Sequence, residues 1–292
     1  MMRPSRNALY GSLLLLPAAL LLWTFTYQPI LATFVDSFLS TPRGRRPARF
    51  IGFDHYQVMA ADPVFWKALS NNAIYAVTTI PLSMALALAM ALFVHAKVRG
   101  QFLVRMAYFT PTVLPMVAVA NIWMFFYAPD YGLIDQILRP FGLGGNNWLG
   151  SPDTALTSLI VITVWKEAGF FMIFYLAALQ QISPTLLEAA QIEGASYGQQ
   201  LHRVIIPLLM PTTLFISINA VIGAFRLVDH VVAMTKGGPD NATMLLLFYI
   251  YQVGFSFWDT GYAAALTVIL LAILMLVALF QFGYADKRVH YR

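Results

Sequence analysis

The chain contains no cysteine and few charged residues. Asp, Glu, Lys and Arg make up 11% of its 292 residues, whereas a soluble domain carries roughly 25%. The absence of cysteine excludes disulfides and cysteine metal sites. The basic residues are scattered and no zinc or RNA-binding motif accompanies them, so no nucleic-acid partner is expected. The histidines have no metal-ligand spacing, so we predict no metal site; they are His55, His95, His202, His230 and His290.

Apolar residues dominate what is present. Hydrophobic residues make up 59% of the chain, and the mean hydropathy is +0.69. Six segments are long enough to cross a hydrocarbon core about 30 Å thick. The sequence therefore predicts an all-α polytopic membrane protein, with one domain over residues 1–292. Pro111 and Pro115 predict kinks in the third segment. The six predicted spans cover residues 9–31, 71–94, 106–127, 155–179, 206–228 and 263–282.

The polar stretch 183–205 lies between the fourth and fifth spans. Ser183 and Pro184 are typical of a helix start, because serine caps backbone N–H groups and proline needs no such partner. Gly194 allows a turn that a side chain would obstruct. Ser196 and Gln199 have the spacing of a capping box for a second short helix. The pattern predicts a helix–turn–helix in the aqueous phase that leads directly into the fifth span.

An even number of spans places both termini on one side of the membrane. If that side is cytoplasmic, Lys and Arg are slightly more frequent in the inner segments than in the outer ones, although the cluster from Arg43 to Arg49 opposes this orientation. The stretch 183–205 would then also be cytoplasmic. We therefore expect both termini to be cytoplasmic. The outer segments are then residues 32–70, 128–154 and 229–262.

The motif within 183–207 resembles the EAA loop of the permeases of ATP-binding-cassette (ABC) importers. Glu188-Ala189-Ala190 is followed at the expected spacing by Gly194, Val204 and Ile206-Pro207. The resemblance implies that residues 183–205, here called the coupling loop, contact a partner ATPase. Glu188 would meet the ATPase surface, and Gly194 would make the turn. The implied ATPase-coupling residues are Glu188, Ala189, Ala190, Gly194, Ala195 and Pro207.

The resemblance extends to the carbohydrate-uptake permeases, which include the maltose and glycerol-3-phosphate importers. It is carried by Gly237-Gly238-Pro239, Ile250-Tyr251, Gly254-Phe255 and Val289-His290-Tyr291. It implies a multi-pass protein of the bacterial inner membrane, in contact with lipid. It also implies a second, homologous permease, a dimer of ATP-binding subunits and an extracytoplasmic substrate-binding protein. The chain has no G-x-x-x-x-G-K-[ST] loop, so ATP and Mg are expected to bind to the partner ATPase and no cofactor to this chain.

Ionisable residues within predicted spans are costly and therefore suggest function. Lys166 and Glu167 lie in the fourth span, and Arg226 lies near the end of the fifth, with Asp229 three residues later. Two interpretations remain open. In the first, these charged side chains line a substrate pathway. In the second, Lys166 pairs with Glu167 and Arg226 pairs with Asp229, so that the charges neutralise each other at a helix contact.

The maltose-type resemblance implies sugar contacts on the spans that flank the coupling loop. On the fifth span this chain departs from the family, because Ala220, Ala224 and Leu227 replace small polar residues. Asn219, Gly223 and Arg226 are therefore expected as substitutes. The implied pathway residues are Thr163, Lys166, Glu167, Phe170, Asn219, Gly223 and Arg226.

The sequence thus predicts a permease subunit of an ABC importer for a carbohydrate. The substrate is a sugar, an oligosaccharide, or a sugar or polyol with an anionic group such as glycerol-3-phosphate; we expect a neutral sugar before an anionic one. A self-contained channel or secondary transporter is the alternative, although six spans without a detectable repeat disfavour it. A membrane enzyme is disfavoured because no cluster of catalytic His, Asp or Ser residues lies in the spans.

Overall fold

The computed structural model describes residues 6–42, 44–96, 100–142, 144–226 and 228–285. This part of the chain is mainly helical, and an isolated antiparallel bridge pairs Leu39 with Phe50. The chain divides into two compact units. Unit 1 contains residues 1–62 and 250–273, and unit 2 contains residues 63–249 and 274–292. Two of the three boundaries fall inside helices. One transmembrane domain over residues 1–292 stays a prediction.

Unit 1 begins with a long apolar helical segment, whose side chains from Leu13 to Asp36 bury nothing against the rest of the chain. A helix that is apolar on all sides and unpacked within its own chain is suited to lipid or to a partner helix. The helices of unit 1 are α1 (Arg6–Leu22), η1 (Trp23–Tyr27), α2 (Gln28–Asp36), α3 (Asp54–Ala61), η4 (Gln252–Ser256) and the first part of α15 (Thr260–Ala285).

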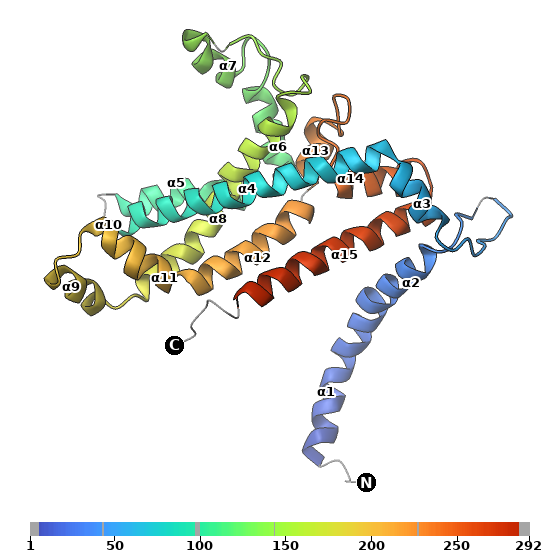
Figure 1. The fold of residues 1–292 in the computed structure, drawn as a ribbon, viewed down its shortest axis with the longest axis horizontal. Helices are drawn as coiled ribbons and strands as arrows, with labels where there is room; N and C mark the ends of the chain where they lie inside the picture. Colours follow the sequence, from blue (N-terminus) through green and yellow to red (C-terminus); the bar gives the residue numbers. More distant parts are fainter. Residues whose placement is uncertain (1–5, 43, 97–99, 143, 227, 286–292) are drawn as a thin grey trace. The chain divides into compact units, whose positions relative to one another are not determined.

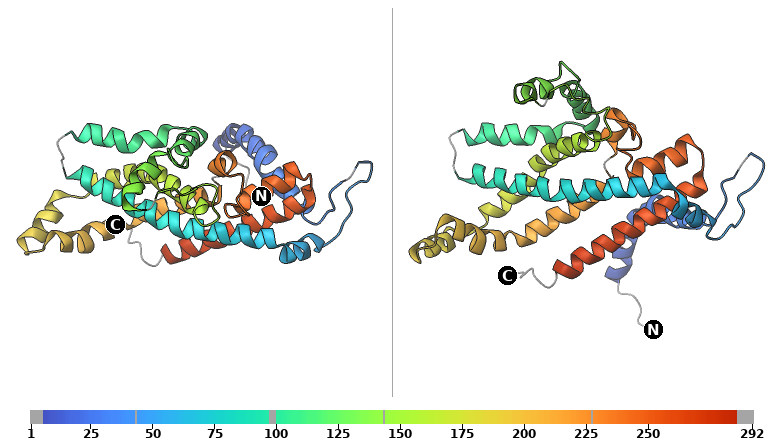
Figure 2. Two further views of the ribbon diagram at one scale, coloured as in Figure 1. Left: turned by 90° about the horizontal axis from the view of Figure 1, so that it is seen from above. Right: turned by 45° about the horizontal axis from the view of Figure 1, so that its top comes forward.

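Unit 2 is built around the long helices α4 (Pro63–His95) and α8 (Ala155–Gln180), which run side by side (Figure 1). Helix α5 also packs against α8 (Figure 2). The remaining helices are α5 (Gln101–Val113), α6 (Met116–Phe126), α7 (Leu133–Leu138), η2 (Arg139–Phe141), α9 (Pro184–Ile192), α10 (Tyr197–Gln200), η3 (Leu201–Ile205), α11 (Ile206–Leu208), α12 (Met210–Arg226), α13 (Asp229–Met234) and α14 (Leu246–Tyr251).

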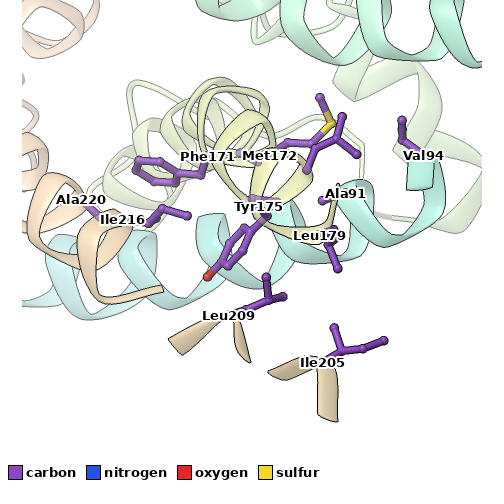
Figure 3. Packing of buried hydrophobic residues seen from close by; sticks show 13 residues of the cluster. Ala91, Val94, Phe171, Met172, Tyr175, Leu179, Ile205, Leu209, Ile216 and Ala220 are labelled. Carbon is purple, nitrogen blue, oxygen red and sulfur yellow. The ribbon is translucent and has the colours of Figure 1, made fainter. Parts of the chain in front are cut away.

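Helix α8 carries the core of unit 2 (Figure 3). Phe171 and Tyr175 are almost fully buried, and Ala87 and Ala91 of α4 are completely buried. In a membrane, helices associate through close packing, and small residues let their backbones approach each other. The alanines of α4 therefore explain why α4 and α8 lie together along their length. Further members of the cluster are Val94, Met172, Leu179, Ile205, Leu209, Ile216 and Ala220.

Among the described residues, five helical stretches are long and apolar enough to cross a membrane, and a sixth candidate is a bent pair. That pair, α5 and α6, occupies the third predicted span and is bent by 104°. The structure thus has two helices where a single kinked helix was expected. Leu114 is extended because the following proline disfavours helical geometry, and Pro115, which has no N–H group to satisfy, is the N-cap of α6.

The contact between α5 and α8 depends on Gly169. A Cβ atom at this position would lie 2.2 Å from the backbone oxygen of Tyr108. We expect Gly169→Ala to lower the stability by about 1–3 kcal/mol, because the two helices would have to separate. The measurement is the temperature at which the detergent-solubilised protein loses its monodisperse peak. Gly283→Ala is the matched control, since a Cβ atom there meets nothing within 4 Å; equal midpoints for the two variants would contradict the close approach.

Candidate functional site

A small cavity lies inside unit 2, where α4, α8 and α12 meet. Thr163 and Glu167 of α8 line it together with Gly223 of α12, so three of the seven predicted pathway residues come together here. The free volume is about that of one water molecule, so this cavity cannot hold a sugar without opening. The other lining residues are Thr79, Ile80, Ser83, Phe171, Ala220 and Ala224.

The α4 wall of the cavity is a polar stripe that sequence reasoning missed. Tyr75, Thr79 and Ser83 are spaced by four residues, and such residues share a helix face. The Thr79 hydroxyl donates to the Tyr75 backbone oxygen at 2.7 Å, and the Ser83 hydroxyl donates to the Thr79 backbone oxygen at 2.6 Å. These bonds satisfy both hydroxyls inside an apolar helix. A polar residue at every fourth position was the signal that would have revealed this stripe.

A buried hydrogen-bond network lies beside the cavity. The Tyr75 hydroxyl is 2.6 Å from Thr163 Oγ1 and 3.1 Å from His230 Nε2. The Tyr75 and His230 rings stack with their centroids 5.8 Å apart. His230 is fully buried, so its hydrogen bond ties α13 to α4. No histidine was assigned a role from the sequence, because the partner of His230 is distant along the chain.

Lys166 does not reach this cavity and instead caps the break between α5 and α6. Its Nζ atom donates to the backbone oxygens of Pro111 at 2.9 Å, Thr112 at 3.4 Å and Leu114 at 2.7 Å. These carbonyls have lost helical partners at the bend, and an ammonium group has three hydrogens to offer. These contacts favour a structural role for Lys166 over a role in the substrate pathway. Its partners are backbone oxygens, whereas the sequence suggested a pair with Glu167.

The remaining predicted pathway residues do not join the cavity. Phe170 is 40% exposed and packs edge-on against Phe174. Asn219 is exposed and donates to the Phe215 backbone oxygen at 2.8 Å. Arg226 is exposed at the end of α12. In the part of the chain that the structure describes, it forms no ion pair with Asp229, and Leu227 lies outside the described residues.

The coupling loop has the predicted helix–turn–helix geometry. Helix α9 ends at Ile192, and Gly194 makes the turn with φ +81°, a value that side chains disfavour. Ser196 and Gln199 form the expected capping box at the start of α10. One detail differs, because the Ser183 hydroxyl pairs with the Thr185 hydroxyl at 2.7 Å and does not cap the backbone of α9.

The coupling loop presents apolar side chains that the chain itself does not cover. Ile192 is 88% exposed and Tyr197 is 65% exposed. Glu188, Ala189, Gly194 and Pro207 are exposed as well, whereas Ala190 and Ala195 are half-buried. Exposed apolar side chains beside a carboxylate are typical of a protein contact surface.

The segment with Gly237-Gly238-Pro239 is tied to the start of α4. The Asn71 amide donates to the backbone oxygens of Asn241 at 2.8 Å and Met244 at 3.0 Å. Asn72 Oδ1 accepts from the Leu246 backbone at 3.2 Å. The two asparagines thus hold this segment against α4. The Val289-His290-Tyr291 motif lies outside the described residues.

Comparisons with known proteins agree with this architecture. Residues 67–291 match the family described as binding-protein-dependent transport system inner membrane component. The sulfoquinovosyl glycerol transport system permease protein of Agrobacterium fabrum is 33% identical over 93% of this chain and 88% of its own length. The lactose transport system permease protein of Rhizobium radiobacter is 34% identical over 95% of this chain and 94% of its own length.

A solved structure has the same fold. It is a chain of a bacterial alginate ABC transporter in complex with an alginate pentasaccharide-bound periplasmic protein. The TM-score is 0.85, with 22% identity, and the match covers 97% of this chain and 96% of that chain.

Lys166 provides the sharpest test of the site geometry. We expect Lys166→Met to destabilise unit 2 by about 1–3 kcal/mol, because it leaves three backbone oxygens at the break without their donor. Lys67→Met removes an exposed cation from α4 and serves as the control. Thermal stability of the two purified variants is the measurement. If Lys166→Met and Lys67→Met have the same melting temperature, the contacts of Lys166 with the carbonyl oxygens do not stabilise the bend.

Proposed function

Because this chain belongs to the family of inner-membrane components of binding-protein-dependent transport systems, we propose that residues 183–205 transmit ATPase movements to the cavity between α4, α8 and α12. The chain is a multi-pass permease subunit of an ABC importer for carbohydrate and is not an enzyme. The exposed helix–turn–helix carries the proposal. Glu188, Ala189, Ala190, Gly194, Ala195 and Pro207 would contact or position the ATPase.

A second, homologous permease would complete the pathway. Two observations support this partner. The cavity of this chain holds about one water molecule, and no residue of the helical segment Leu13–Asp36 is buried. A dimer of ATP-binding subunits would bind ATP and Mg, since this sequence has no phosphate-binding loop. A substrate-binding protein would deliver the carbohydrate from the extracytoplasmic side.

Thr163, Glu167 and Gly223 are the pathway residues that the geometry supports best, because they share one cavity. A neutral sugar is favoured over an anionic one. Lys166 already donates to three backbone oxygens, which leaves Arg226 as the predicted pathway cation without such a commitment among the described residues. The two permease relatives serve sulfoquinovosyl glycerol and lactose at nearly equal identity, so similarity does not select the substrate.

The coupling role is tested in the complex reconstituted with its ATPase, second permease and binding protein. Glu188→Lys reverses a charge at the contact, and Gly194→Val imposes a side chain on a residue with φ +81°. We expect both variants to lose most substrate-stimulated ATP hydrolysis while remaining inserted in the membrane. Gly198→Ala, in the same loop and with open space around its Cβ, should keep it. Normal stimulated hydrolysis in both variants would refute the assignment.

The proposed orientation places both termini and the coupling loop in the cytoplasm. Residues 1–5 and 286–292 lie outside the described residues, so a reporter that requires export is the direct measurement. It should be active when inserted near Gly144 and silent when fused after Arg292. The reverse pattern would overturn the orientation and the ATPase contact together.

A further inference from the structure

Unit 1 contains an open pocket of about 340 Å³ whose lining includes none of the proposed pathway residues. That volume is at the lower end of the range for small-ligand sites. Polar side chains contribute to its lining, and the cationic ones are Arg46 and Arg49. Ser40, Thr41, His55 and Asp259 complete the polar lining.

The pocket is built on a short hairpin that follows α2. The Ser40 backbone donates to the Arg49 oxygen at 2.8 Å, and the Ile51 backbone donates to the Phe38 oxygen at 2.9 Å. His55 Nε2 donates to the Leu39 oxygen at 3.0 Å. These bonds hold the base of the hairpin, and with it the backbone at Arg49.

The charge of the pocket is not neutralised. Asp259 Oδ1 accepts from the Thr41 hydroxyl and, at 3.2 Å, from the Tyr262 backbone, so this oxygen has partners of its own. Within the described ranges no carboxylate lies at ion-pair distance from Arg46 or Arg49. Two guanidinium groups and one carboxylate leave an excess of positive charge. Guanidinium groups are matched to carboxylates and phosphates, which they bind in a bidentate manner.

The composition around the pocket is that of a protein-binding surface. Phe50 is 78% exposed and Phe53 is 66% exposed on the same hairpin and its continuation. Arginine and aromatic residues are the types enriched in interface cores and binding hot spots. The hydrogen-bonded base of the hairpin also reduces the entropy cost of docking.

We propose that this pocket receives a carboxylate side chain from the extracytoplasmic substrate-binding protein. The inference rests on the proposed function, in which residues 32–70 face the side on which that protein arrives. Outer loops usually carry few Lys and Arg residues, and docking of the binding protein would account for the arginine cluster in this one. The contact steers the loaded binding protein to the permease, so its strength falls as salt increases.

The test uses the assembled complex in lipid nanodiscs and the substrate-binding protein that stimulates its ATPase. The variant Arg46→Gln/Arg49→Gln removes both guanidinium groups from the pocket. Arg45→Gln is the matched control, because Arg45 is exposed on the same hairpin and does not line the pocket. We expect the double variant to bind the loaded protein about tenfold more weakly at low salt and with less salt dependence. The control should stay within about twofold of the unchanged complex.

Two further arms identify the anion. Arg46→Glu/Arg49→Glu should abolish binding, and a lysine replacing one acidic residue of the binding protein should restore it. Failure of every such lysine to restore binding would overturn the proposal. The loss should also persist in nanodiscs of phosphatidylcholine alone. A loss that appears with phosphatidylglycerol present and vanishes without it would assign the pocket to lipid and overturn the proposal.

The outcomes separate this inference from the proposed function. If no binding protein stimulates the complex, the proposed function itself fails. If stimulation is normal and Arg46→Gln/Arg49→Gln binds like Arg45→Gln, the proposed function stands and the docking site is wrong. Co-purification of all subunits and an unchanged melting temperature establish that the double variant is folded.

Discussion

The ammonium group of Lys166 meets three backbone oxygens at the break between α5 and α6. In a membrane an exposed backbone oxygen has no water to bind, so a chain that turns by 104° at this point needs an internal donor. Helix α8 supplies that donor, and Gly169, one turn further, lets α5 lie against the same helix. The bend, the packing of α5 and the position of α8 are thus parts of one constraint.

Helix α8 also connects the two functional regions. It carries Thr163 and Glu167 at the cavity and ends at Gln180, immediately before the coupling loop. The loop returns through η3 and α11 into α12, which carries Gly223 on the opposite wall. A force on the loop therefore acts on two walls of the cavity at once. In the proposed function, this covalent arrangement would let the ATPase move the cavity walls through the coupling loop.

Much of this architecture could be predicted from the sequence, because it depends on local patterns. The length of the apolar segments predicted the long helices, and the spacing of Ser196 and Gln199 correctly predicted the capping box. The partners of Lys166 could not be predicted, since they lie 52 to 55 residues away and are backbone atoms exposed by an unforeseen break. His230 was missed for the same reason. The stripe of Tyr75, Thr79 and Ser83 was readable in principle, because a four-residue period needs no tertiary information.

The central claim is that movement of the coupling loop changes the separation of α4 and α12 around the cavity. The chain has no cysteine, so spin labels placed at Leu82→Cys and Ile222→Cys report on this protein alone, once partner cysteines are removed. Both positions are exposed and each adjoins a residue of the cavity wall. Pulsed electron paramagnetic resonance should show a shift of several Å between the nucleotide-free and ATP-bound complexes, and Gly194→Val should abolish it. An identical distance distribution in both states, with ATP hydrolysis and transport intact, would contradict the account.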